Sequence, residues 1–336
     1  MRFIKINAKD HYEAGYKLGK LTTKLQKAFL KEYILPMSWD ILIRKSRGLL
    51  KATKKIFPQY IDEIHGLANG ADISFEKLWV LHCIDEIVHK QCIEKCSSIF
   101  VRTDTGYLIG HNEDWESWTK EYHFMQERTI NGKTVLELNL AGAICGGTVS
   151  INSYGLVQTI NTLYHTDFQI GVPKSIIARW LSGMSTLENV KNEFPSYVRA
   201  AGYCYNLALQ NKVLSIESSA HLHEFIETHS SYIHTNHYTG TLTKVENEST
   251  KETPSFVRYN LIKSMLGTIQ NTLALQKTLL HTTEPPNSMA SIYRSTEVST
   301  IASLIFDIPH GCLWVTQENK GIDTKWYCIS LDFLKP

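Results

Sequence analysis

Long apolar runs and a strong net charge are both missing from this sequence of 336 residues. No stretch approaches the ~18 consecutive apolar residues that a membrane-spanning helix needs. The formal net charge is only +2, whereas nucleic-acid binding normally leaves a basic patch in the sequence. We therefore expect no membrane and no nucleic-acid partner, and we expect a small-molecule ligand instead.

A secretory signal and a disulfide framework are also missing. The N-terminus, Met1-Arg2-Phe3-Ile4-Lys5, has no long apolar core followed by a small-residue cleavage site. Seven cysteines are spread widely along the chain. An odd number at such spacing is not typical of a disulfide scaffold. These features predict a cytoplasmic protein with reduced cysteines, most of them small buried side chains.

Hydrophobic residues make up 43% of the chain, which is enough for a large core. The first ~95 residues carry mainly helical spacing, and the pattern then changes to alternating strands with two helical interludes. Helices are expected at 11–35, 39–68, 72–92, 173–194, 255–267 and 271–280. Strands are expected at 97–101, 107–110, 122–130, 134–140, 145–151, 155–161, 202–217, 223–234, 298–306, 311–317 and 325–331. This order predicts stacked layers of sheet and helix.

The segment 96–115 predicts a β-hairpin around the turn signal Asp104-Thr105-Gly106. With the turn centred on Thr105, Cys96 and Asp114 are expected opposite each other, with Cβ atoms about 4.5–5.5 Å apart. A thiolate is a nucleophile, and its protonation depends on nearby charges. A carboxylate beside a thiol disfavours the thiolate, so Asp114 is compatible with a thiolate at Cys96 only if a cation lies between the two side chains. The residues alone leave open a buried core cysteine and an aspartate that caps the strand.

Several motifs occur in one order along the chain, and together they are more specific than any of them alone. Around Cys96 they are Cys96-Ser97-Ser98-Ile99 and Gly110-His111-Asn112-Glu113-Asp114-Trp115; elsewhere they are Tyr12-Glu13-Ala14-Gly15-Tyr16, Leu18-Gly19, 58–70, Asn152-Ser153-Tyr154-Gly155-Leu156, Asn161-Thr162-Leu163, His234-Thr235-Asn236-His237-Tyr238 and Ser255-Phe256-Val257-Arg258. This set resembles the acyl-coenzyme A:6-aminopenicillanic acid (isopenicillin N) acyltransferase-like family. That family belongs to the N-terminal nucleophile (Ntn) hydrolases and is related to choloylglycine hydrolase and penicillin V acylase.

The resemblance implies an α+β fold, a four-layer αββα sandwich of two antiparallel sheets with a mostly helical N-terminal pro-segment. It also implies autocatalytic cleavage between Lys95 and Cys96, which leaves an α chain of residues 1–95 and a catalytic β chain of residues 96–336 in one domain. The freed α-amine of Cys96 then acts as general base, since its ordinary pKa of about 7.7–8.0 suits proton transfer. An α/β heterodimer results.

The same resemblance assigns roles to further residues. Asp114 positions the Cys96 amine, and Asn236 and Asn161 donate to the oxyanion. Arg258 lies near Cys96 and favours its thiolate. The implied reaction is hydrolysis or transfer of an N-acyl amide or acyl thioester through an S-acyl-Cys96 intermediate, with acyl-coenzyme A as a candidate donor.

Three aromatic residues follow Asp114 and are candidates for an apolar acyl pocket: Trp115, Trp118 and Tyr122. The same three side chains could equally belong to the core. His111 stands where the choloylglycine branch has an arginine, so the substrate chemistry of that branch is not carried over.

Two other interpretations remain. Lys95 replaces the small residue expected before the nucleophile, which leaves room for an uncleaved, non-catalytic relative that acts as a binding or scaffold protein. A metal-dependent hydrolase is the third alternative, with candidate histidines at His234 and His237 and at His221 and His223 beside Glu224. Neither group has the His-Glu-x-x-His spacing of a zinc-binding helix. We therefore predict no metal and no cofactor.

Overall fold

The structure is a computed structural model, and it describes residues 1–89, 96–246, 254–282, 289 and 298–334. The predicted cleavage partner Lys95 lies outside the described residues, and so does Cys92. Cys96 itself is described.

The N-terminal part is mostly helical, as predicted. Its helices are α1 (His11–Glu32), α2 (Trp39–Ile56), α3 (Pro58–Ala71), α4 (Phe75–His82) and α5 (Ile84–Val88). The sequence predicted one helical region over 39–68, but the structure divides it at Phe57. Pro58 has no backbone N–H, so it begins a helix well and continues one poorly.

Helices α1 and α3 pack at very close range through glycine. A Cβ atom on Gly15 would lie 1.9 Å from the carbonyl oxygen of Glu63, and one on Gly66 would lie 2.0 Å from that of Tyr12. Such distances are far shorter than van der Waals contact, so only glycine fits at these two positions. This explains the Gly15 and Gly66 of the N-terminal motifs.

One strand of the N-terminal part was not predicted. Residues Arg2–Ala8 form β1, which pairs in parallel with β4 (His123–Ile130) at the edge of a sheet. Ile6 and Ala8 are buried on it. The N-terminal part therefore contributes a strand as well as helices, and the sheet that it joins is not purely antiparallel.

Two sheets form the centre of the molecule. Sheet A has the strand order β1-β4-β5-β6-β7-β8-β9-β10, and sheet B has the order β11-β2-β3-β12-β13-β14. The further strands of sheet A are β5 (Lys133–Leu140), β6 (Val149–Asn152), β7 (Val157–Asn161), β8 (Cys204–Leu209), β9 (Lys212–Ser218) and β10 (His223–Thr228). Those of sheet B are β2 (Ser97–Thr103), β3 (Gly106–Glu116), β11 (Tyr232–His234), β12 (Val298–Asp307), β13 (Cys312–Thr316) and β14 (Tyr327–Ser330). Apart from β1 with β4, the pairings are antiparallel.

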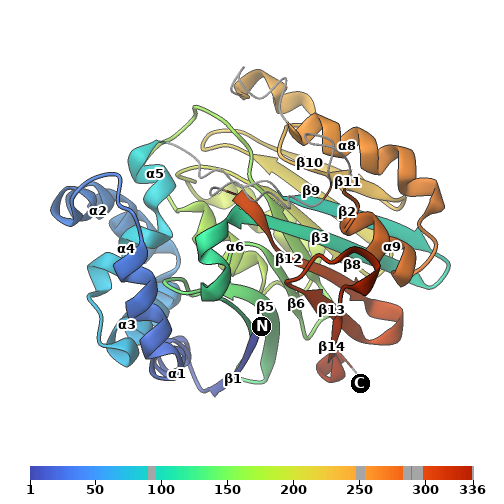
Figure 1. Ribbon diagram of the computed structural model, residues 1–336. Helices are drawn as coiled ribbons and strands as arrows, with labels where there is room; N and C mark the ends of the chain where they lie inside the picture. The colour runs from blue at the N-terminus through green and yellow to red at the C-terminus, as the bar shows by residue number, and fades with distance from the viewer. Residues whose placement is uncertain (90–95, 247–253, 283–288, 290–297, 335–336) are drawn as a thin grey trace.

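Three hydrophobic cores separate four layers. The first lies between sheet A and the helices α1–α5, α6 (Lys174–Leu181) and α7 (Leu187–Glu193). The second lies between the sheets, where Phe100 and Ile109 meet Met125 and Leu138. The third lies between sheet B and helices α8 (Pro254–Met265) and α9 (Thr272–Leu279). Figure 1 shows the blue helices and the orange helices on opposite sides of the sheets. The predicted αββα arrangement is confirmed.

Two further findings concern the cysteines and the membrane. Cys312 and Cys328 are joined in a disulfide with an S–S distance of 2.06 Å, so the prediction that all cysteines are reduced is wrong for this pair. The two residues lie on neighbouring strands, β13 and β14, which a count of cysteines does not show. Among the described residues, no helix combines the length and the apolar character needed to cross a membrane.

Candidate active site

The β2–β3 hairpin places Glu113, rather than Asp114, across from Cys96. Its turn contains two residues, Asp104 and Thr105, because Thr103 pairs with Gly106. Continued along the hairpin, this register pairs Ser97 with Asn112, and one step further sets Cys96 against Glu113. The predicted opposition of Cys96 and Asp114 is therefore wrong by one residue. A slip of one residue moves a side chain to the other face of the sheet.

The thiol of Cys96 is buried between the sheets beside a histidine–glutamate pair. Its Sγ lies 3.7 Å from Oε1 of Glu113 and donates to it. Oε2 of the same carboxyl lies 3.0 Å from Nε2 of His111. All three side chains are buried. Glu113 was not among the predicted site residues. The signal for it is the run of four polar residues, His111 to Asp114, which are all buried on β3.

Polar groups of sheet A continue this cluster across the interface between the sheets. Nδ1 of His111 lies 3.0 Å from Oγ of Ser98, which donates to Oδ1 of Asn161 at 2.8 Å. Thr159 on β7 donates to the same Ser98 oxygen at 2.8 Å. The predicted site residue Asn161 is therefore linked to Cys96 through Ser98, His111 and Glu113.

Arg258 of α8 connects Cys96 to Asn236 on the other face of sheet B. One terminal nitrogen of its guanidinium donates to the carbonyl oxygen of Cys96 at 2.8 Å and to Oγ of Ser97 at 2.6 Å. The second donates to Oδ1 of Asn236 at 2.7 Å. The amide nitrogen of Asn236 donates to the carbonyl oxygen of Thr162 at 3.0 Å. The structure thus brings together three of the predicted site residues that lie far apart in the sequence.

Asp114 shares the electrostatic surroundings of Arg258. Its Oδ1 accepts a hydrogen bond from Oγ1 of Thr300 on β12 at 2.5 Å. Burial lowers the pKa of Arg258, while Asp114 and Cys96 both act to raise it. Arg258, 162 positions beyond Cys96, is thus a cation that interacts electrostatically with both Asp114 and Cys96, although the side chain of Cys96 faces Glu113.

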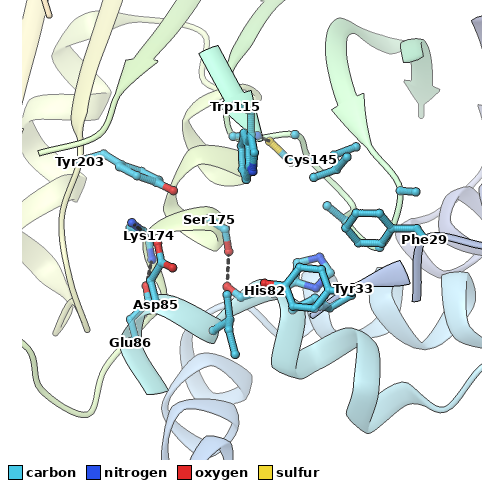
Figure 2. A pocket seen from close by; sticks show the side chains of 18 residues that line it. Phe29, Tyr33, His82, Asp85, Glu86, Trp115, Cys145, Lys174, Ser175 and Tyr203 are labelled. Carbon is cyan, nitrogen blue, oxygen red and sulfur yellow. Dashed lines mark hydrogen bonds and ion pairs between the residues drawn. The ribbon is translucent and has the colours of Figure 1, made fainter. Parts of the chain in front are cut away.

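A pocket lies at the end of β3, where Trp115, Cys145, Lys174 and Tyr203 are among the residues that line it (Figure 2). Cys96 and Glu113 are not among its lining residues. Trp115 lines it and lies two residues from Glu113, so both side chains are on the same face of the strand. Lys174 and Asp85 form an ion pair of 2.7 Å on the opposite wall. Burial has the largest effect on Glu86 in this wall and raises its pKa to about 7, although the nearby Lys174 acts to lower it. The pocket therefore joins an aromatic wall to a charged one.

The other two aromatic candidates lie outside that wall. Trp118 and Tyr122 pack against Phe29, with ring centroids 5.5 Å and 5.4 Å away. Phe29 and Tyr33 line the pocket. Trp118 and Tyr122 thus support residues of the pocket from behind, whereas Trp115 faces into it.

The candidate metal histidines have other partners. His234 is paired with Glu217 at 2.9 Å, and His221 is paired with Asp167. Within the part of the chain that the structure describes, the group that could hold a metal ion is Cys96, His111 and Glu113, whose ligand atoms lie within 4.8 Å of one another. A thiol, an imidazole and a carboxylate are ligands that zinc accepts.

Comparison with known proteins identifies the family. A model of the family described as acyl-coenzyme A:6-aminopenicillanic acid acyl-transferase matches residues 101–321. The chain belongs to this family. The match begins just after Cys96 and includes Asp114, Asn161, Asn236 and Arg258. The resemblance read from the motifs is therefore confirmed, and the acyl-transferase family is one of Ntn-type acyltransferases and amidohydrolases.

Two curated relatives are similar to this member of the acyl-transferase family over part of its length. The β-alanyl-dopamine/carcinine hydrolase of Drosophila melanogaster is 31% identical over 207 residues, which cover 53% of each chain. The 40 kDa form of acyl-coenzyme A:6-aminopenicillanic-acid-acyltransferase of Emericella nidulans is 28% identical over 137 residues, 40% of this chain and 38% of the relative. The chain thus matches about half or less of the length of these relatives.

Solved structures of conjugated bile acid hydrolase from Clostridium perfringens are also similar. Two variants of that enzyme each share 12% sequence identity with this chain and cover 70% of it. The TM-scores are 0.46 and 0.48, over 92% and 93% of the respective solved chains.

Proposed function

We propose that this protein is a self-processing cysteine amidohydrolase or acyltransferase in which Cys96 is the nucleophile. The observation that carries the proposal is the position of Cys96. Its buried thiol adjoins Glu113 and His111, and its carbonyl oxygen is held by Arg258, which also binds Asn236. A nucleophile with titratable groups and amide donors around it suits acyl transfer.

The proposed reaction begins with cleavage between Lys95 and Cys96, which leaves residues 1–95 and 96–336. The new α-amine has an ordinary pKa of about 7.7–8.0 and takes the thiol proton in each later turnover. The thiolate attacks the acyl carbonyl, an amine or thiol leaves, and water or a second amine releases the acyl group. Asn236 and Asn161 are the proposed donors to the oxyanion, and one such donor contributes about 2.7–4 kcal/mol of barrier lowering. Asp114 positions the amine.

The pocket beside Trp115 is the proposed place for one half of the substrate. Its aromatic wall suits an apolar or aromatic group, and its wall of Lys174, Asp85 and Glu86 suits a charged or zwitterionic end. β-Alanyl-dopamine and carcinine are therefore the first test substrates for hydrolysis. An acyl-coenzyme A donor with 6-aminopenicillanic acid is the first test pair for transfer.

Intact-mass analysis of purified protein tests the processing. We expect two chains that divide between Lys95 and Cys96, while the Cys96→Ala variant stays whole. Activity on the test substrates is expected only in the divided protein. A single, inert wild-type chain would contradict the proposal and favour the non-catalytic alternative. In that case Cys96 should also react with a thiol probe no faster than the other free cysteines.

A metal-dependent hydrolase is a second candidate because Cys96, His111 and Glu113 could hold a metal ion. In that enzyme the cysteine is a ligand and not a nucleophile. Dialysis against a chelator then abolishes activity, and added zinc restores it. Activity that survives the chelator, in protein whose metal content has been measured as negligible, excludes this candidate.

A further inference from the structure

Self-cleavage, a step of the proposed function on which this inference rests, needs a base that the mature enzyme does not need. Before cleavage the nitrogen of Cys96 is an amide, which accepts no proton at neutral pH. The α-amine that serves later turnovers does not yet exist. The thiol proton must therefore go to another group, and Oε1 of Glu113, 3.7 Å from Sγ, already accepts a hydrogen bond from the thiol.

The hydrogen-bond network fixes where the protons of this cluster lie. Ser215 donates to Oδ1 of Asn206 at 2.8 Å, so the amide nitrogen of Asn206 is the group that donates to Oδ1 of Asn161 at 2.9 Å. With its oxygen on that side, Asn161 also accepts the single hydroxyl proton of Ser98. Ser98 therefore has no hydrogen left for His111.

His111 must then donate to Ser98 from Nδ1. Oγ of Ser98 has two lone pairs, which accept from Thr159 and from His111. The Nε2 atom of a neutral His111 carries no hydrogen, and it faces Oε2 of Glu113 at 3.0 Å. One proton must lie between these two atoms.

We propose that Glu113 and His111 form a proton relay that accepts the thiol proton of Cys96 during self-cleavage. The thiol proton passes to Oε1 of Glu113 while the proton shared between Oε2 and Nε2 moves fully to Nε2 of His111. The products are a thiolate, a neutral carboxylic acid and an imidazolium held by Ser98. Glu113 is the catalytic residue of this step, because it touches the reacting thiol. His111 acts through Glu113 and is a positioning residue.

The remaining steps return every proton. The thiolate adds to the carbonyl carbon of the peptide bond before Cys96. The relay then runs in reverse and protonates the departing nitrogen as its C–N bond breaks, which leaves a thioester. Water hydrolyses the thioester to a carboxylate and the free thiol, the proton released in this step is taken up by the new α-amine of Cys96, and no other reactant is consumed.

Among the described residues, charged and polar groups from several packed elements surround the relay. Arg258 from α8 is the cation, and Asp114 and Tyr164 interact with it electrostatically. Strand β7 contributes Thr159 and Asn161, which do not titrate. In wild-type protein we expect the cleavage rate to be nearly independent of pH between about 6 and 8, because the relay only exchanges protons internally.

The test follows cleavage of the full chain by pulse-chase after cell-free translation, with a chelator present and the pH set at the start of the chase. Loss of a general base typically slows a reaction about 10²–10⁴-fold, so we expect Glu113→Gln to slow cleavage by at least 10²-fold at pH 7. Its rate should also rise about tenfold per pH unit, because hydroxide must now remove a thiol proton of ordinary pKa about 8.5.

A second variant and a control keep the result interpretable. His111→Gln should show the same slope, and the double variant should be no slower than Glu113→Gln alone, because the two residues act as one unit. Glu217→Gln is the matched control, since it removes another buried histidine-paired carboxylate. It should leave the pH slope of cleavage flat even if it lowers the yield of folded protein.

The outcomes separate the two proposals. Wild-type rate and a flat profile in Glu113→Gln or in His111→Gln overturn the relay and leave self-cleavage intact. A wild-type chain that is never cleaved overturns the proposed function, and the relay with it. Slow cleavage with an unchanged flat slope shows a merely structural role for Glu113 and also overturns the relay.

Discussion

Two buried histidine–glutamate pairs of similar geometry occur in this molecule. His111 lies 3.0 Å from Glu113, and His234 lies 2.9 Å from Glu217. Both pairs are buried at the interface between the sheets. They differ in their other hydrogen bonds. Glu217 also accepts from the backbone and hydroxyl of Thr239 and from the backbone of Gly240.

The donors around Glu217 help to keep that carboxylate charged. Burial raises the pKa of Glu217, but His234 and Thr239 outweigh it and hold the pKa at about 2. Nδ1 of His234 donates to the carbonyl oxygen of Thr235, and Cys204 and Glu217 raise the pKa of His234 well above its ordinary value despite burial. This pair is a fixed ion pair. In the pair beside Cys96, burial instead lowers the pKa of His111 to about 3, and the proposed relay moves the proton that this pair shares. Burial alone therefore does not make a histidine–glutamate pair structural or catalytic.

The largest expected effect concerns the ion pair. Glu217→Gln leaves a buried imidazolium without its carboxylate, and breaking a buried pair in this way costs about 3–5 kcal/mol. Glu113→Gln leaves a neutral histidine and should cost about 1–3 kcal/mol. Urea unfolding in the uncleaved Cys96→Ala background measures both. An equal loss of unfolding free energy in Glu217→Gln and Glu113→Gln would contradict the proposed difference in charge between the two pairs.

Arg258 joins the two regions, because it binds both Cys96 and the Asn236 that follows His234. Arg258→Lys keeps the charge but loses the forked geometry that reaches three acceptors at once. We expect kcat/KM to fall about 10²-fold, which is about 2.7 kcal/mol, with a smaller change in unfolding free energy. Steady-state kinetics on the divided protein checks this. Activity within a factor of two of wild type would show that the link is dispensable.

His111 and His234 should affect the pH dependence of the unfolding free energy in opposite directions. His111 has a folded pKa of about 3, below the unfolded value of about 6.5. The unfolded chain then binds more protons between these values, so stability falls as pH drops from 6.5 towards 3, by up to about 1.4 kcal/mol per unit. His234 has a raised folded pKa, so its contribution is full below about 6.5 and is lost as pH rises through the folded pKa.

Unfolding free energies measured from pH 4 to 9, again in the Cys96→Ala background, test this contrast. His111→Gln should flatten the acid limb of the profile, and His234→Gln should flatten the alkaline limb. His82, His123, His165 and His237 also have lowered pKa values, each about 4, so the acid limb of His111→Gln is reduced and not abolished. The same limb flattened by both variants would contradict the assignment of charge.

The smallest expected effect concerns the pocket beside Trp115. Trp115→Ala removes one aromatic wall and should raise KM about tenfold, or about 1.4 kcal/mol, with little change in kcat. Trp118→Ala is the matched variant behind the wall and should act mainly on stability. Kinetics with the best test substrate separates the two. Equal changes in KM would remove Trp115 from the proposed substrate site.

Most elements of the fold could be predicted from local pattern, because helical and strand periodicity mark which residues face a core. The strand β1 was missed although Ile4, Ile6 and Ala8 alternate with polar residues. Seven residues at a terminus form a strand only when an edge such as β4 accepts them. The disulfide between Cys312 and Cys328 likewise depends on the pairing of two strands.

The site was predicted less completely than the fold. The motifs selected Cys96, Asn161, Asn236 and Arg258, but their mutual contacts span up to 162 positions and leave no local pattern. The partner of Cys96 was misassigned because the turn has two residues and not three. That difference of one position replaces Asp114 with Glu113 on the inner face. The proton relay could not be read from the sequence, since it depends on donors from β7 and β8.

The central claim is that Cys96 carries the acyl group. In the most direct test, the divided protein is mixed with an acyl donor whose acyl group leaves the enzyme slowly. The reaction is quenched with acid, and the intact mass of residues 96–336 is measured. We predict a gain in mass equal to one acyl group. Peptide mapping should locate this group at Cys96, and hydroxylamine treatment should remove it. Turnover of the donor with no acyl group on Cys96 at any quench time would contradict it.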